Sequence, residues 1–126
     1  MRLRSMLFVP GDSDRKFIKA AGIGADALIL DLEDSVAPSM KIEARSKVST
    51  LLDDGRPRDW LFFVRINPFD TGMTYEDMAA IVKPGLDGLL IPKADGADDV
   101  ARVAKELDRL EADAGMPVGS VKIAVV

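Results

Sequence analysis

The sequence predicts an α/β fold built around a parallel β-sheet. Apolar runs alternate with helix-like segments, and the runs begin roughly every 22–33 residues, a spacing typical of successive strand–helix units. The runs are continuously apolar rather than alternating, which indicates strands that are buried on both faces. With 126 residues, 48% of them hydrophobic, the chain is long enough to form one sizeable core.

Five apolar runs are the expected strands. Turn residues bound them: Pro10-Gly11 follows the first run and Asn67-Pro68 follows the third. No further element follows the last run, so the residues leave two architectures open, a doubly wound five-stranded domain and the first half of a closed barrel. The expected strands are Ser5–Val9, Ala27–Leu32, Trp60–Ile66, Gly88–Ile91 and Val121–Val126.

Amphipathic segments connect these strands. Apolar residues recur in them at helical spacing, and Ser13, Ser39 and Thr74 stand where N-caps belong. The expected helices are Ser13–Gly22, Ser39 to about Leu52, Thr74–Val82, and a long helix from Asp95 or Ala97 to about Ala114.

The composition excludes several classes of function. A formal net charge of -4 and a pI of about 4.8 argue against nucleic acid as a partner. The absence of Cys and His removes thiolate metal sites, Cys nucleophiles and the Ser-His triad. No run approaches membrane-spanning length, and Pro10-Gly11 interrupts the first run too early for a signal peptide. We therefore expect a soluble, cytoplasmic protein with no membrane partner.

Three acids follow the second expected strand directly. Asp31, Glu33 and Asp34 stand where a strand leaves the carboxyl edge of a parallel sheet, which is where α/β active sites lie. Carboxylates beside a dry core need a cationic partner. The acids either organise a site for catalysis or a metal, or they cap and solvate the next loop.

Cations stand at the ends of two other strands. Arg65 lies inside the third apolar run, where it needs a carboxylate, and that carboxylate belongs either to a substrate or to Glu33 or Asp34. Asn67 follows in a rigid turn that would present it to a ligand. Lys93 follows the fourth strand, where we expect it to orient the acids rather than to form a Schiff base.

The loop after the first strand is a weaker candidate site. Gly11 permits close backbone approach, a helix N-terminus favours anions, and Arg15 adds a positive charge. The P-loop pattern is absent, so a simple strand–helix turn is an equally good interpretation.

Four motifs in this order resemble the CitE-like family, the group of citrate lyase beta subunits and malyl-CoA lyases within the HpcH/HpaI aldolase superfamily. They are Arg4–Asp12, Ala25–Pro38, Val64–Pro68 and Gly88–Lys93. The resemblance implies a TIM (β/α)8 barrel, of which this chain supplies about the first five strands and four helices. Residues 1–126 would then be the N-terminal portion of a single catalytic domain.

The resemblance also implies an activity. Family members are Mg²⁺-dependent carbon–carbon lyases that cleave a 3-hydroxy-acyl-CoA, such as citryl-CoA or malyl-CoA, to acetyl-CoA and a 2-oxo acid. They are usually homotrimers or hexamers. The family's metal ligands correspond to positions after Val126, so no metal ligand is expected within residues 1–126.

The family pattern assigns roles to several residues. Arg65 would bind the substrate carboxylate, while Glu33, Asp34 and Lys93 would form a charged catalytic network. Pro10, Gly11 and Arg15 would lie near the CoA. These roles are expectations that the resemblance carries.

Two functions of other classes compete with the lyase. A receiver-type signalling domain fits the length, but it needs an Asp at the end of the third strand, where this chain has Arg65-Ile66-Asn67-Pro68. A non-catalytic CoA-binding or assembly module is the other alternative.

Overall fold

A computed structural model describes residues 3–55, 57–92 and 96–125 of the chain. Five parallel strands form one sheet in the order β1-β2-β3-β4-β5, so each strand pairs with the one before it in sequence. The strands are β1 (Met6–Pro10), β2 (Ala27–Asp31), β3 (Leu61–Arg65), β4 (Gly88–Ile91) and β5 (Lys122–Val125).

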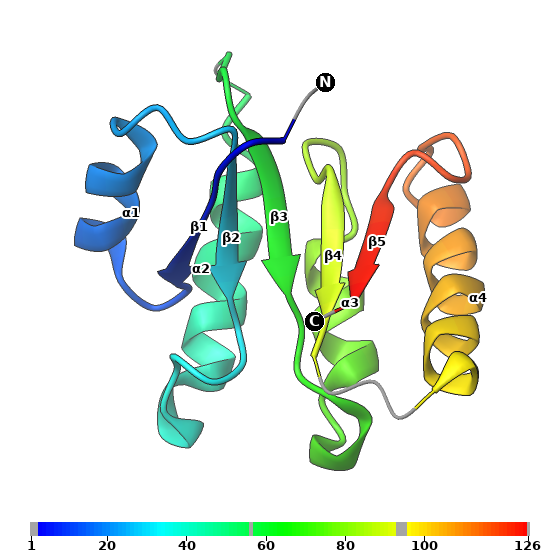
Figure 1. Ribbon diagram of the computed structural model, residues 1–126. Coiled ribbons are helices and arrows are strands. Elements are labelled where there is room, and N and C mark those ends of the chain that lie inside the picture. The colour runs from blue at the N-terminus through cyan, green and yellow to red at the C-terminus, as the bar shows by residue number, and fades with distance from the viewer. Residues whose placement is uncertain (1–2, 56, 93–95, 126) are drawn as a thin grey trace.

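Helices connect successive strands, as Figure 1 shows. The predicted elements are all present, and no end of an element differs from its predicted bound by more than two residues. The helices are α1 (Asp14–Ala21), α2 (Lys41–Leu52), α3 (Thr74–Ile81) and α4 (Ala97–Asp113), with short 3-10 turns η1 (Pro38–Met40) and η2 (Phe69–Thr71) before α2 and α3.

One of the three predicted N-caps is confirmed. The Ser13 hydroxyl accepts a hydrogen bond from the Lys16 N–H at 3.3 Å. The predictions for Ser39 and Thr74 were wrong, because Met40 and Met73 occupy the cap positions of α2 and α3 without a side-chain bond. Ser39 lies inside η1, and the buried Thr74 hydroxyl donates to the Asn67 carbonyl at 2.9 Å. Thr74 therefore fixes the turn after β3 rather than the start of a helix.

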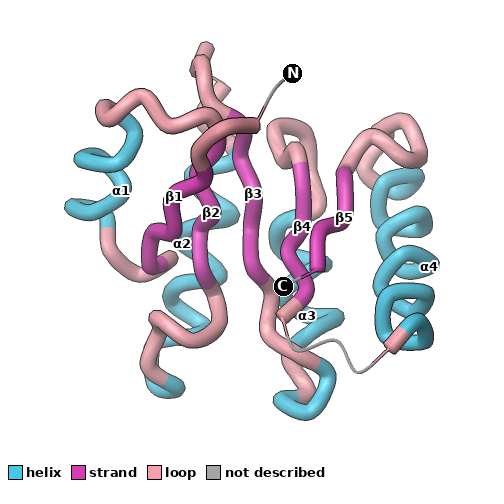
Figure 2. Tube along the Cα trace, in the orientation of Figure 1, coloured by secondary structure: helices cyan, strands magenta, loops and turns pink. Residues whose placement is uncertain are grey.

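The sequential strand order decides between the two architectures that the sequence left open. A doubly wound sheet of the receiver type has the order 2-1-3-4-5 and places helices on both faces. Here the order is 1-2-3-4-5, and residues from all four helices share one core cluster with one face of the sheet. This is the arrangement of a β/α barrel, with helices on the outer face only, and Figure 2 shows the helices on that side.

Alternate residues of each strand separate the two faces. On the outer face, Leu28, Leu30 and Leu32 of the β2 segment and Phe62 and Val64 of β3 pack in the main core against the helices. The inner face holds a separate small cluster of Ala27, Ile29, Phe63 and Leu90. A Cβ on Gly88 would lie 2.6 Å from the Phe63 ring, so the glycine makes room for that ring.

None of the helices in the described residues combines the length and apolar character that crossing a bilayer requires.

Candidate functional site

The candidate site lies on the inner face, at the carboxyl edge of the sheet. Asp31 is the last residue of β2 and Arg65 the last of β3, and the two are register partners. Arg65 Nε donates to Asp31 Oδ1 at 2.8 Å and Arg65 Nη2 donates to Asp31 Oδ2 at 2.7 Å. The two side chains therefore form a bidentate ion pair across neighbouring strands.

Asp31 is fixed from the other side by the loop that follows it. Its side chain is 0% exposed, and it accepts hydrogen bonds from the Glu33 N–H at 2.9 Å and from the Ser35 N–H and hydroxyl at 2.9 and 2.6 Å. Burial alone would raise the pKa of Asp31, but the hydrogen bonds from Arg65, Ser35 and Glu33 outweigh it and lower the pKa to about 2. Asp31 is therefore a carboxylate at any physiological pH.

Arg65 is held by groups on more than one side. Its guanidinium carbon lies 4.6 Å from the centroid of the Phe8 ring, in a cation–π contact. The hydrogen bond to Asp31 raises the pKa of Arg65, with smaller contributions from the charges of Glu33 and Asp34. The side chain is 15% exposed, so the charge sits at the rim of the sheet and not in bulk solvent.

The three acids of the motif lie in different environments. Glu33 is buried, with Oε1 3.7 Å from Arg65 Nε. Asp34 is exposed in the loop after β2. The carboxylate closest to Arg65 is thus that of Asp31, and not that of Glu33 or Asp34, the two protein partners predicted from the sequence.

The loop after β1 contacts the same region through its backbone. Pro10 is the register partner of Asp31, and the Gly11 N–H donates to the Asp31 carbonyl at 2.8 Å. A Cβ on Gly11 would lie 2.7 Å from that carbonyl oxygen, so glycine is required for the close approach of the two strands. Arg15 is exposed on α1, and Lys93 lies outside the described residues.

Asn67 is engaged with protein partners. It is 1% exposed, its Oδ1 accepts from Lys41 Nζ at 2.7 Å, and its Nδ2 donates to Asp77 Oδ2 at 2.8 Å. The same Asp77 oxygen accepts from the Asn67 N–H at 2.8 Å. Both ends of the amide thus hold neighbouring elements in place, and the expected contact of Asn67 with a ligand stays a prediction.

A supporting network that was not predicted from the sequence surrounds Asn67. Lys41 Nζ also donates to the carbonyls of Leu32 and Glu33 at 3.1 and 2.9 Å, and so ties the acidic loop to the turn after β3. Asp77 continues the network through Arg45 Nε at 2.9 Å.

A sequence signal for this network exists. Asp77 interrupts the buried stripe of α3, which comprises Thr74, Asp77, Met78 and Ile81 at helical spacing. An acid on the apolar face of a helix indicates a buried partner.

A shallow cleft of about 320 Å³ opens between the loops after β2 and β3, with Glu33, Asp34, Lys41 and Asn67 among its lining residues. It places charged groups and solvent-accessible space at the edge where a ligand of a β/α barrel binds. Glu33, whose Oε1 lies 3.7 Å from Arg65 Nε, is the lining residue that connects this cleft to the Asp31–Arg65 pair.

The described residues do not fit a magnesium site. No group of three or more Asp or Glu side chains among them is arranged to hold a metal ion. Both Asp31 oxygens are occupied by donors from Arg65, Ser35 and Glu33. Mg²⁺ binds proteins through one or two carboxylates and completes its octahedron with water, and neither Asp31 oxygen is free to serve as such a ligand.

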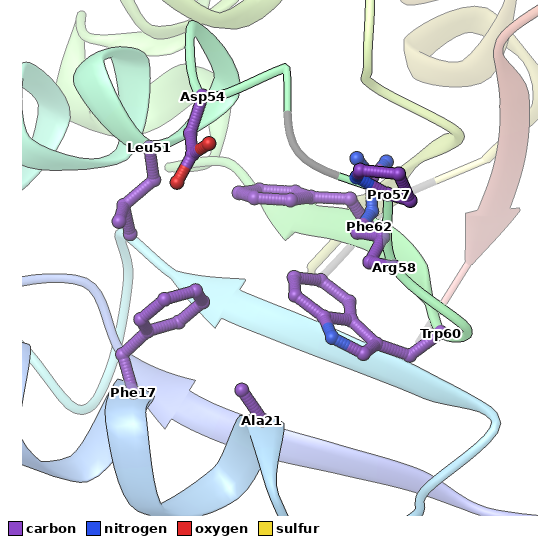
Figure 3. A pocket seen from close by; sticks show the side chains of 8 residues that line it. All are labelled: Phe17, Ala21, Leu51, Asp54, Pro57, Arg58, Trp60 and Phe62. Atoms are coloured by element: carbon purple, nitrogen blue, oxygen red, sulfur yellow. The ribbon is translucent and has the colours of Figure 1, made fainter.

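A second cleft, of about 260 Å³, lies between α1, the end of α2 and the start of β3, at the opposite edge of the sheet (Figure 3). Phe17, Trp60 and Phe62 line it, and Arg58 stacks on the last two rings at 5.1 and 5.4 Å. These rings also pack with the main core. The cleft is distant from the charged pair and forms no part of the candidate site.

Comparison with known proteins decides the family. The model of the HpcH/HpaI aldolase/citrate lyase family matches residues 4–126. The chain belongs to this family. The resemblance of its four motifs is thereby confirmed, as is the prediction that it is part of an α/β, TIM-barrel fold.

Curated relatives in the HpcH/HpaI family include enzymes with two different names. A (3S)-malyl-CoA thioesterase of Cereibacter sphaeroides is 42% identical over 101 residues, which cover 80% of this chain and 35% of the relative. The citrate lyase subunit beta of Escherichia coli is 41% identical over 117 residues, which cover 93% of this chain and 39% of the relative. The chain thus spans less than half the length of these relatives.

Solved structures agree with the fold. A Haloferax volcanii malate synthase in a magnesium/glyoxylate complex superposes with a TM-score of 0.84 at 22% identity, covering 98% of this chain and 42% of that one. CitE of Mycobacterium tuberculosis, in complex with magnesium, acetoacetate and coenzyme A, has a TM-score of 0.64 at 36% identity, covering 79% and 35%. The first similarity concerns the fold alone.

Proposed function

We propose that this chain forms the N-terminal part of a single TIM-barrel domain that cleaves a carbon–carbon bond in a 3-hydroxy-acyl-CoA, releasing acetyl-CoA and a 2-oxo acid. The observation that carries the proposal is the Arg65 guanidinium. It is held at the carboxyl edge of the barrel strands, on the inner face, by a bidentate bond to Asp31. Arg is the residue best suited to bind a second carboxylate in a planar, two-point contact.

The reaction explains why such a group is needed. In malyl-CoA and citryl-CoA a carboxylate is attached to the carbon that bears the hydroxyl. Cleavage turns that hydroxyl into a carbonyl with loss of its proton, and the electrons of the broken bond go to the acyl-CoA fragment, which then takes up a proton to become acetyl-CoA. A guanidinium that binds this carboxylate fixes the position of the reacting carbon. It also offsets the negative charge of the carboxylate attached to that carbon.

The remaining assignments follow the family and belong to the proposal. Glu33, Asp34 and Lys93 would surround the substrate with charge, and Pro10, Gly11 and Arg15 would lie toward the CoA. Mg²⁺ is the proposed cofactor of the complete protein, because the CitE relative was solved with magnesium and coenzyme A. We also propose a cytoplasmic homotrimer or hexamer.

Thioester hydrolysis is the second candidate. It is favoured by the relative at 42% identity, which is a (3S)-malyl-CoA thioesterase. Hydrolysis leaves the carbon skeleton intact and releases free CoA with a hydroxy acid, so the two reactions differ in their products.

The test is a product assay on the complete protein with Mg²⁺ and either malyl-CoA or citryl-CoA. Lyase activity yields a 2-oxo acid and acetyl-CoA in equal amounts, with no free thiol. Free thiol without 2-oxo acid selects the thioesterase. Saturable binding of both acyl-CoA esters without turnover selects the non-catalytic module, and failure to bind either of them overturns the proposal.

A further inference from the structure

We infer that Asp31 is a positioning residue that sets which edge of Arg65 faces the substrate. A guanidinium has five N–H donors arranged along its edges. Asp31 takes the edge formed by Nε and Nη2. The edge formed by Nη1 and the second Nη2 proton is left for another carboxylate. The inference rests on the proposed function, because it assigns the occupant of that edge as the substrate carboxylate.

The free edge is consistent with the contacts of Arg65. Within the described residues, Nη1 makes no hydrogen bond, and the two bonds to Asp31 are the hydrogen bonds of the side chain. The Glu33 carboxylate lies on the Nε side of the guanidinium, at 3.7 Å. The Nη1 edge is therefore the one that a ligand can take without displacing an existing hydrogen bond.

Asp31 is itself too constrained to follow a ligand. Three donors from Glu33 and Ser35 hold its two oxygens, and the side chain is fully buried. The Gly11 N–H holds the Asp31 carbonyl at 2.8 Å, and the Phe8 ring covers one face of the guanidinium. A guanidinium that is bound along one edge and covered on one face has little freedom to rotate. Its remaining edge therefore points in a defined direction.

A competing role for Asp31 makes the opposite prediction. Asp31 would act as a placeholder if the substrate carboxylate displaced it from Arg65, and removing its charge would then tighten substrate binding. Displacement would leave a buried carboxylate without its cation, which is unfavourable. We therefore take the positioning role as the inference and the placeholder as the outcome that overturns it.

The experiment is chemical rescue in the complete protein. Arg65→Ala removes the guanidinium and leaves the Asp31 carboxylate and the Phe8 ring to bind a free guanidinium ion. Guanidinium at millimolar concentration is expected to raise kcat/KM of Arg65→Ala by about tenfold or more, and that of Arg65→Ala/Asp31→Asn by less than about twofold. The double variant removes both charges, so it leaves no lone buried charge to compromise folding.

Asp31→Asn alone provides the second measurement. Equilibrium binding of glyoxylate and oxaloacetate, the 2-oxo acids from the two test substrates, is expected to weaken by about tenfold or more, because Arg65 loses its fixed orientation. Asp108→Asn is the matched control, since Asp108 is an exposed acid on α4, away from the candidate site. It is expected to leave binding unchanged. Arg65→Lys keeps a positive charge opposite Asp31 but lacks the planar pair of donors that a guanidinium provides. It is expected to fold and to bind glyoxylate and oxaloacetate poorly.

The outcomes separate the two proposals. Equal rescue of the single and double variants, or tighter binding of the acids by Asp31→Asn, overturns the positioning role. Absence of turnover in the wild-type protein overturns the lyase instead. In that case the melting temperature still decides whether Asp31 holds the guanidinium: millimolar guanidinium is expected to raise Tm of Arg65→Ala and not of the double variant, and equal shifts overturn the role.

Discussion

The two faces of the five-stranded sheet are built from alternate residues of the same strands, and they differ in helix cover, in the size of their apolar clusters and in charge. The outer face is covered by four helices and contributes to one large apolar core. The inner face carries a small apolar cluster and, at its carboxyl edge, the Asp31–Arg65 pair with the half-exposed Phe8. Stability is concentrated on one side of the sheet, and the candidate chemistry on the other.

The difference between the two faces explains how a continuous apolar run can contain a charged residue of the candidate site. Leu30 and Leu32 flank Asp31 and point into the outer core, while Val64 and Ile66 flank Arg65 in the same way. The flanking residues fix the strand in register, and the register places the acid opposite the arginine. Variants of neighbouring residues therefore separate the two faces experimentally.

The largest effect is expected on the outer face. Leu30→Ala removes a side chain that is 0% exposed and leaves a cavity in the main core. It is expected to lower the free energy of unfolding by about 2–5 kcal/mol, measured by urea denaturation of the complete protein. Ile18→Ala is the control, because Ile18 is 71% exposed on α1, and a change within about 0.5 kcal/mol is expected. Equal losses in the two variants would contradict the assignment of the core.

The next effect is kinetic and belongs to the inner face. Arg65→Ala is expected to lower kcat/KM by about 10²–10³, because the substrate carboxylate loses its two-point contact. Steady-state kinetics on 3-hydroxy-acyl-CoA substrates measure it. Val64→Ala, one residue away on the outer face, is expected to lower Tm while the folded enzyme keeps kcat/KM within about threefold. If Val64→Ala impaired catalysis as severely as Arg65→Ala, the separation of the two faces would be refuted.

A smaller effect is expected where the loop after β1 meets the inner-face pair. Gly11→Ala places a Cβ 2.7 Å from the Asp31 carbonyl oxygen, and we expect overpacking to lower the free energy of unfolding by about 1–3 kcal/mol. Chemical denaturation measures the loss. Gly22→Ala is a matched control, since its Cβ would meet only the Lys19 carbonyl at 3.7 Å. The prediction fails if both alanine variants are as stable as the wild type.

The smallest effect is a pH dependence that only the charged face should show. The folded-state pKa of Asp31 is about 2, below its ordinary value of 3.8. The unfolded chain therefore takes up a proton first as the pH falls. The stabilisation is complete above about pH 4–5, and about 2 kcal/mol of it is lost as the pH falls through 2. The stability difference between wild type and Asp31→Asn should shrink by that amount between pH 5 and pH 2, and a constant difference would contradict the assignment.

Much of the fold follows from the sequence because the signals are local and repeated. Apolar runs and helical periodicity locate β1 to β5 and α1 to α4, and the Gly88–Ile91 strand has the predicted bounds. The order of strands in the sheet does not follow from these signals, because a doubly wound domain and a barrel share the same alternation. The family resemblance indicated the barrel, and the strand order confirms it.

The site was predictable only in part. Acids and an arginine at strand ends suggest a charged edge, but which acid binds Arg65 depends on strand register, and register places Asp31 there. The role of Asn67 was missed because its partners Lys41 and Asp77 come from two different helices, 26 and 10 residues away in the chain. Asp77 on the apolar face of α3 indicates a buried partner, but which residues meet it depends on how α2 and α3 pack on the sheet.

The strand order has a consequence for how the protein is made. Each strand from β2 to β5 pairs with the one that precedes it in the chain, so during synthesis each of these four strands meets an edge that has already emerged. The ribosome thus delivers β1 to β5 in the order in which this part of the sheet grows.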